Sequence, residues 1–220
     1  MKDNLIDYAK IGLVYHLLYP DCEEDPIYHI KTLTEFINIY NIETFDTIMP
    51  FNRIYRKQLE PVLKKCGKEI VFNNHISLLK KINLSSNSYI DYEIAMLIFK
   101  DQIKVAKSIG AKGYLFTSGR NVGKKQRKIA INKFKDFCRW FCSRLLKYGI
   151  FAMIEPSDTN VDKRFLIGPT EECAELVDSL GIDNLGIALD FAHILLLGES
   201  FYDAVKNTYK FLKRVHIGNC

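Results

Sequence analysis

The chain has 220 residues, of which 48% are hydrophobic and 26% are charged, and its formal net charge is +5. These values are typical of a soluble globular protein with a substantial core, and they favour a single domain. The absence of any long uninterrupted apolar run argues against a membrane partner, and residues 1–10 contain no apolar signal core, so we expect a cytoplasmic protein. The mild positive charge suits a small anionic substrate, whereas a nucleic-acid partner would need a stronger basic signature.

Short apolar runs alternate along the chain with longer stretches of helical period. This alternation is typical of βα units that build a parallel sheet. Seven strands are predicted, at residues 11–15, 44–49, 69–72, 113–116, 150–154, 185–189 and 215–217. The helices predicted between them lie near residues 30–40, 55–66, 90–109, 124–148, 171–180 and 201–212.

Local signals mark several of the helix ends. Gly67 directly follows a predicted helix, where a glycine in the left-handed conformation closes the last turn. Thr170 is expected to cap the helix that begins with Glu171. Ser200 and Asp203 have the spacing of a capping box, which predicts the start of the last helix.

Seven strands are one fewer than a closed (β/α)8 barrel needs. We expect an α/β fold, a TIM barrel in which the eighth strand is missing, with residues 1–220 forming one barrel domain that is truncated at its C-terminus. A further βα unit, or another chain such as a second copy in a homo-oligomer, would cover the open barrel edge. An open doubly wound sheet is the alternative, but it would place a glycine-rich turn after the first strand, where His16–Pro20 stands instead.

Polar side chains follow several of the predicted strands, at the edge where parallel α/β folds place their active sites. Glu155 and Asp190 follow the fifth and sixth strands, and His216 lies within the seventh. Two carboxylates and an imidazole aimed at one point are costly without a cation between them, so we expect one divalent metal ion. Oxygen-rich ligation favours Mn²⁺, Mg²⁺ or Co²⁺ and leaves Zn²⁺ open. The alternative is a hydrogen-bonded polar layer that caps the barrel.

Three further histidines lie at or near strand ends. His16, His75 and His193 follow the first, third and sixth strands, which makes them candidates for binding a substrate. A single histidine in such a place is more often a structural residue, and only the convergence of several on one edge points to a site.

The second half of the chain contains a set of motifs, which are Gly113–Gly119, Ile154-Glu-Pro156, Leu166–Thr170, Leu189-Asp-Phe-Ala-His193 and Val215-His-Ile-Gly-Asn-Cys220. Together these motifs resemble the xylose-isomerase-like TIM barrels of the sugar phosphate isomerase/epimerase family. The resemblance implies that Glu155 is both a metal ligand and a catalytic acid/base, that Asp190 and His216 are metal ligands, and that His193 contacts substrate hydroxyls. It also implies substrate contacts for Asp158 and Lys163. The family's fourth ligand and opposing base is a glutamate after strand eight, which the sequence does not reach.

The predicted function is therefore a divalent-metal-dependent isomerase or epimerase of a sugar or sugar phosphate. Proton transfer next to a carbonyl creates an enediolate, whose negative charge a bound metal would stabilise. One alternative is a metal-dependent DNA repair nuclease resembling endonuclease IV, which His75 and the net charge support and the uncharged strand ends at Pro50 and Thr117 oppose. Another alternative is a non-catalytic barrel fragment.

Overall fold

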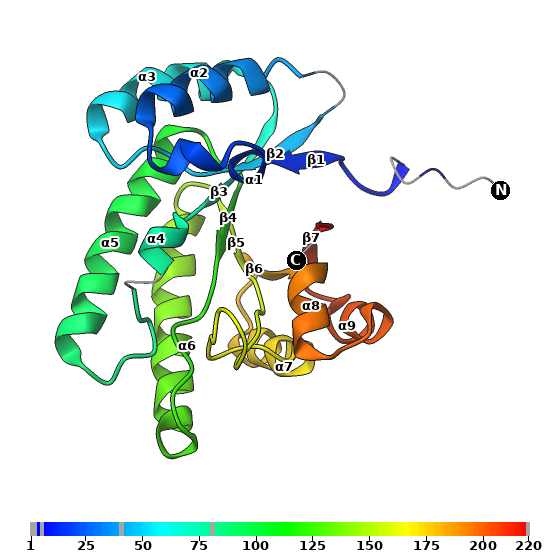
Figure 1. The fold of residues 1–220 in the computed structure, drawn as a ribbon. Helices are drawn as coiled ribbons and strands as arrows, with labels where there is room; N and C mark the ends of the chain where they lie inside the picture. Colours follow the sequence, from blue (N-terminus) through cyan, green and yellow to red (C-terminus); the bar gives the residue numbers. More distant parts are fainter. Residues whose placement is uncertain (1–3, 5–6, 40–41, 80–81, 219–220) are drawn as a thin grey trace. The chain divides into compact units, whose positions relative to one another are not determined.

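The computed structural model describes residues 4, 7–39, 42–79 and 82–218 (Figure 1). Within these residues, seven parallel strands follow one another in chain order in one sheet, so the α/β class and the incomplete TIM barrel are confirmed. The strands are β1 (Gly12–Val14), β2 (Thr44–Thr47), β3 (Glu69–Asn73), β4 (Gly113–Phe116), β5 (Phe151–Ile154), β6 (Leu185–Asp190) and β7 (Leu212–His216). Tyr40, Asn219 and Cys220, which belong to predicted elements and motifs, lie outside the described residues.

Helices fill the connections between the strands. The longer ones, all predicted, are α2 (Pro26–Phe36), α3 (Arg53–Lys65), α5 (Tyr89–Ser108), α6 (Lys124–Leu146), α7 (Thr170–Leu180) and α9 (Phe201–Thr208). The short ones were not predicted, because one or two turns leave too little helical period to read. These are α1 (Tyr15–Leu18), η2 (Pro20–Glu23), α4 (Ile76–Leu79) and α8 (Phe191–Leu197). Among the described residues, no helix has both the length and the apolar character needed to cross a bilayer.

The chain divides into two compact units, each described here by itself. The first comprises residues 1–75 and 104–114, and the second comprises residues 76–103 and 115–220. In the first unit, Tyr15, Phe36 and Phe45 are fully buried and their rings contact one another in sequence, at centroid distances of 5.3 and 5.4 Å. Helices α2 and α3 lie side by side in this unit (Figure 1). Gly67 takes the left-handed conformation expected of it, with φ +72°.

The first unit also buries an uncharged histidine. His29 is fully buried in α2, and burial lowers its pKa to about 4. A histidine in an unfolded chain titrates near pH 6.5, so protons bind the unfolded state more readily at pH values between these two. We therefore expect the free energy of unfolding to fall as the pH drops from about 6.5 towards 4, by up to roughly 3 kcal/mol from this group. Chemical denaturation near pH 7 and pH 4.5 measures the change, and His29→Gln should remove that share of it; an unaltered pH dependence in the variant would contradict the assignment.

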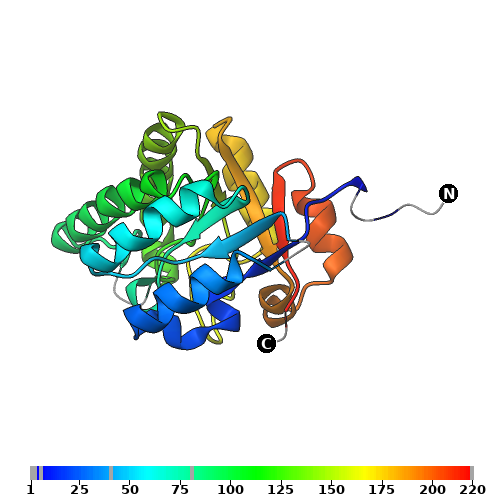
Figure 2. The ribbon, with the colours of Figure 1, turned by 90° about the horizontal axis from the view of Figure 1, so that it is seen from above.

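The core of the second unit is built on α6. Ala130, Phe134, Phe137, Phe141 and Leu145 are buried along one face of this helix. The helix was predicted to extend to Tyr148, but it ends at Leu146 and the chain then turns through Gly149 at φ +66°, which leaves Tyr148 44% exposed. β5 pairs with β6 and β6 with β7 in parallel, and Figure 2 shows β6 and β7 lying next to one another.

One predicted helix cap is confirmed and another is wrong. Ser200 caps α9 as predicted, and its Oγ accepts a hydrogen bond from the backbone N–H of Asp203. Thr170 is the first residue of α7 and does not cap it. Its backbone N–H and hydroxyl both donate to the carboxylate of Glu199, which supplies the acceptor at this helix start. A partner 29 residues away in the sequence leaves no local signal.

Candidate metal centre

The parallel register places two carboxylates and an imidazole at one edge of the sheet. Ile154 of β5 pairs with Ile187 of β6, and Asp190 of β6 pairs with His216 of β7. Glu155 directly follows β5, and its backbone N–H donates to the carbonyl oxygen of Phe116 at the end of β4. Hydrogen bonds between neighbouring strands therefore fix the positions of Glu155, Asp190 and His216 along the sheet.

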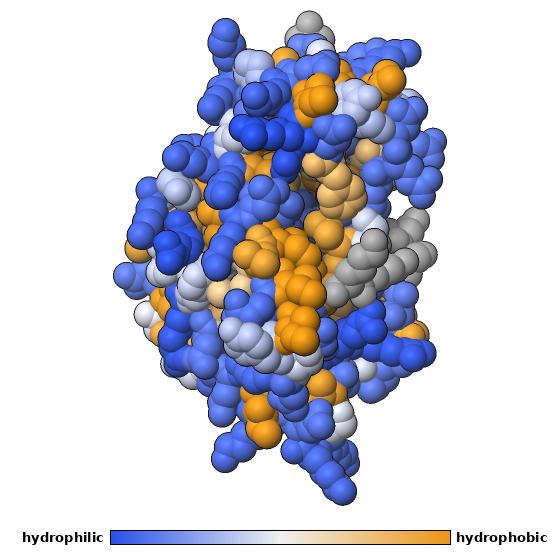
Figure 3. All heavy atoms as spheres, turned by 90° about the vertical axis from the view of Figure 1, so that its left-hand side faces the viewer, coloured by the Kyte–Doolittle hydropathy of each residue, from blue (hydrophilic) through white to orange (hydrophobic). Residues whose placement is uncertain are grey.

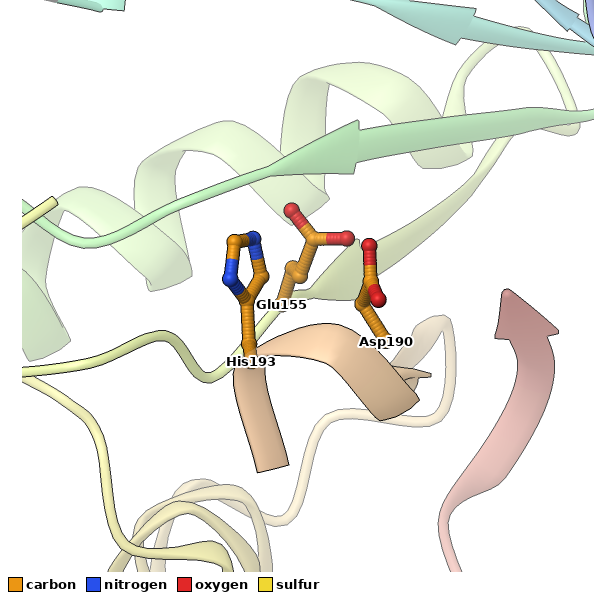
Figure 4. Close-up of side chains that lie close together, drawn as sticks. All are labelled: Glu155, Asp190 and His193. Atoms are coloured by element: carbon orange, nitrogen blue, oxygen red, sulfur yellow. The ribbon is translucent and has the colours of Figure 1, made fainter. Parts of the chain in front are cut away.

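Glu155, Asp190 and His193 lie close together at this edge. One carboxylate oxygen from each acid and one ring nitrogen of the histidine all lie within 4.8 Å of one another. Figure 4 shows the two carboxylates and the imidazole side by side, with Glu155 in the middle. All three residues are only partly exposed. Such a group could hold a metal ion.

Helix α8 brings His193 into this group. Asp190 is the N-cap of α8, and its Oδ1 accepts a hydrogen bond of 2.8 Å from the backbone N–H of Ala192. The cap starts a helix at once after the strand, and this turn places the residue three positions on beside the cap. Asp190 therefore keeps its second carboxylate oxygen for the cluster. The Nδ1 atom of His193 is buried and has no hydrogen-bond partner among the described residues.

His216 also reaches the cluster, through Glu155. Its Nδ1 lies 3.5 Å from Oε1 of Glu155, and the two side chains are 12% and 13% exposed. On the other side of the ring, Nε of Arg214 donates to Nε2 of His216 at 3.4 Å. The contact of Arg214 was not predicted. Arg214 and His216 are two residues apart on β7, and residues at this spacing on a strand share a face, so the sequence did contain a signal for it.

Asp158 and Lys163, predicted to contact substrate, are both engaged within their own loop. The carboxylate of Asp158 accepts hydrogen bonds from the backbone N–H groups of Val161, Asp162 and Lys163. Burial alone would raise the pKa of Asp158, but these backbone donors outweigh it and lower the pKa. The Lys163 ammonium lies 2.6 Å from the Asp162 carboxylate. In this structure, the Asp158 carboxylate holds the loop of residues 158–163 together.

His16 and His75, the other two predicted substrate contacts, belong to the first compact unit. His75 is 1% exposed and stacks on the ring of Phe51. Its Nε2 donates to the carbonyl oxygen of Met49, and its Nδ1 lies 3.3 Å from the Glu23 carboxylate. Burial lowers the pKa of His75. His16 lies in α1 and is partly buried.

The donor set of the cluster suits a hard divalent cation. Two carboxylates held this close together repel each other unless a proton or a cation lies between them. Oxygen donors with one imidazole match Mn²⁺, Mg²⁺ or Co²⁺, and Zn²⁺ accepts the same ligands.

Comparison with known protein families decides where the chain belongs. Residues 37–219 match the model of the xylose isomerase-like TIM barrel family. The chain is a member of this family. The match covers most of the sequence, including β2 to β7 and all four residues around the candidate metal centre. No curated protein sequence matches the chain.

Solved structures share the fold of this xylose isomerase-like chain at low sequence identity. A D-tagatose 3-epimerase-like protein is 16% identical, with a TM-score of 0.74, and the match covers 95% of this chain and 75% of that one. D-psicose 3-epimerase from Clostridium cellulolyticum H10 is 18% identical, with a TM-score of 0.76 and coverage of 96% and 74%. A family 2 AP endonuclease from Brucella melitensis is 17% identical, with a TM-score of 0.72 and coverage of 96% and 80%.

Proposed function

We propose that this chain is a divalent-metal-dependent epimerase or isomerase that acts on a sugar or a sugar phosphate. The observation that carries the proposal is the cluster of Glu155, Asp190 and His193, with His216 beside it, at the carboxyl ends of β5, β6 and β7. The cluster lies in a member of a family whose solved neighbours include proteins described as sugar 3-epimerases. Its position is the one where enzymes of this fold carry out chemistry.

In this proposal, Glu155, Asp190 and His216 hold the metal ion, and His193 contacts substrate hydroxyls. A bound divalent ion would act as a Lewis acid on the substrate carbonyl and stabilise the negative charge that develops there. The second carboxylate oxygen of Asp190 is available to bind the metal ion, because only Oδ1 is used to cap α8. His193 leaves the helix start beside the same carboxylates, where it can donate to or accept from a hydroxyl group.

Glu155 is the proposed acid/base. Its carboxylate would remove the proton next to the carbonyl on one face of the sugar, and the protonated group would return a proton in the reverse direction. Inversion of a stereocentre also needs a second acid/base on the opposite face. The resemblance assigns that role to the glutamate that follows strand eight in the family.

Metal binding provides the direct test of this site. Isothermal titration of wild type with Mn²⁺ should give one site per chain, and Asp190→Asn should weaken it by about 100-fold or more, because the variant loses a charged ligand. Asn is chosen because its side-chain oxygen can still cap α8. Asp183→Asn is a matched control, because Asp183 is exposed on the loop before β6, and it should bind Mn²⁺ like wild type.

The same titration separates the two histidines. His216→Ala should weaken Mn²⁺ binding, whereas His193→Ala should leave it within about threefold if His193 serves the substrate. Failure of wild type to bind Mn²⁺, Mg²⁺, Co²⁺ or Zn²⁺ would reject the metal-dependent mechanism. If His193→Ala weakened Mn²⁺ binding and His216→Ala did not, His193 would be the metal ligand and His216 the substrate contact.

A nuclease is the second candidate, because one of the solved neighbours is described as an AP endonuclease. Incubation of the metal-loaded chain with abasic DNA and, separately, with ketohexoses distinguishes the two activities. Strand cleavage that is lost in Asp190→Asn, without any sugar turnover, would favour the nuclease.

A further inference from the structure

Helix α5 is anchored by one face only. Ala95, Phe99 and Gln102 are buried on that face. The ring of Phe99 lies 4.8 Å from that of Phe137 and 5.2 Å from that of Phe141, both on α6. The contacts with α6 therefore fix which side of α5 points away from the core.

The outward side of α5 is hydrophobic over two turns. Ile90, Ile94 and Leu97 are 69%, 49% and 61% exposed. Spacings of four and three residues place them on one face of the helix. Figure 3 views the side on which α5 lies in Figure 1, and it shows hydrophobic side chains gathered there among polar ones. A row of exposed aliphatic side chains with a polar border is typical of an interaction surface.

Two opposite charges flank this stripe on the same side. Glu93 and Lys100 are seven residues apart, which is close to two helical turns, so they line up along one flank. The residues three and four positions from each of them on α5 are uncharged or, at Lys104, basic. Neither side chain can therefore form the usual ion pair within its own helix.

We propose that the stripe is the interface of a homodimer, in which α5 packs antiparallel against α5 of a second copy. A two-fold axis between Ile94 and Leu97 would place Ile94 of each copy against Leu97 of the other. In an antiparallel pair, each flank faces the same flank of the partner in reversed order. Glu93 of one copy then lies beside Lys100 of the other, and the symmetry makes two such pairs. This self-complementary charge pattern selects a second copy as the occupant. The inference is independent of the proposed sugar chemistry.

Sedimentation velocity of the full chain tests the proposal. The stripe is shorter than a standard interface, so a weak dimer is expected, with a Kd of roughly micromolar to 100 μM, and samples should span about 1–500 μM. Leu97→Asp should raise Kd by about 100-fold, because it buries a charge in the apolar centre. Leu195→Asp is the matched control: Leu195 is 60% exposed on α8, and its substitution should leave Kd unchanged.

Charge reversal tests the antiparallel register itself. Glu93→Lys and Lys100→Glu should each weaken the dimer, because each puts like charges opposite one another. The double variant E93K/K100E should restore it, since the pairs are then re-formed with opposite polarity. Circular dichroism of each variant confirms that the chain is folded. A wild type that stays monomeric at 500 μM, a dimer unaffected by Leu97→Asp, or a double variant weaker than both single ones would overturn the proposal.

Discussion

Glu155→Gln is expected to reduce sugar epimerisation or isomerisation by about 10³-fold or more. The substitution keeps the shape of the side chain but removes the group that accepts and returns the proton, which typically contributes 10²–10⁴-fold, and it removes one charged metal ligand as well. The measurement is kcat on a panel of ketohexoses and their phosphates with Mn²⁺ present. Incorporation of deuterium from D₂O into the substrate reports the proton transfer separately.

The matched control for Glu155→Gln is Glu171→Gln. Glu171 is exposed in the first turn of α7, so its variant should turn over substrate like wild type. Mn²⁺ titration of Glu155→Gln separates weakened metal binding from lost proton transfer, because saturating metal would rescue the former only. Activity of the metal-saturated variant within tenfold of wild type would remove Glu155 from the acid/base role while leaving its role as a ligand open to the titration.

Phe137→Ala is expected to destabilise the second compact unit by about 3–5 kcal/mol, the usual cost of removing a buried aromatic ring and leaving a cavity. Phe137 is fully buried, and its ring lies 5.9 Å from that of Phe116 on β4 and 5.2 Å from that of Phe141. The contact with Phe116 joins α6 to β4. The cavity would therefore be surrounded by other rings that can move only in part to fill it.

Denaturation with urea, followed by tryptophan fluorescence, measures this loss in the right unit. The chain contains a single tryptophan, Trp140, whose ring lies 5.9 Å from that of Phe137. Leu146→Ala is a control on the same helix, because Leu146 is 60% exposed and should cost less than about 0.5 kcal/mol. Equal destabilisation by the two variants would show that the cluster of rings on α6 is not the core of this unit.

Much of the fold could be read from the order of residues alone. Buried parallel strands are short, continuous apolar runs, and a strand such as Leu185–Leu189 is recognisable without any partner. In a long helix such as α6, the apolar residues repeat with the helical period, as Phe134, Phe137 and Phe141 do. The positions of Glu155 and Asp190 at strand ends followed from the same patterns. These features are local, and the sequence by itself determined them.

Only the tertiary structure decided which polar groups meet. His193 joins the carboxylates because Asp190 caps a helix too short to predict, and Asp158 is held by its own loop through backbone N–H groups that no pattern reveals. Thr170 donates a hydrogen bond to Glu199, and His75 donates one to the carbonyl oxygen of Met49, although each pair of residues is far apart in the sequence. A hydrogen bond requires its two atoms to lie about 3 Å apart, whatever the distance between the residues in the sequence. Such contacts therefore form only when strands pair and helices pack.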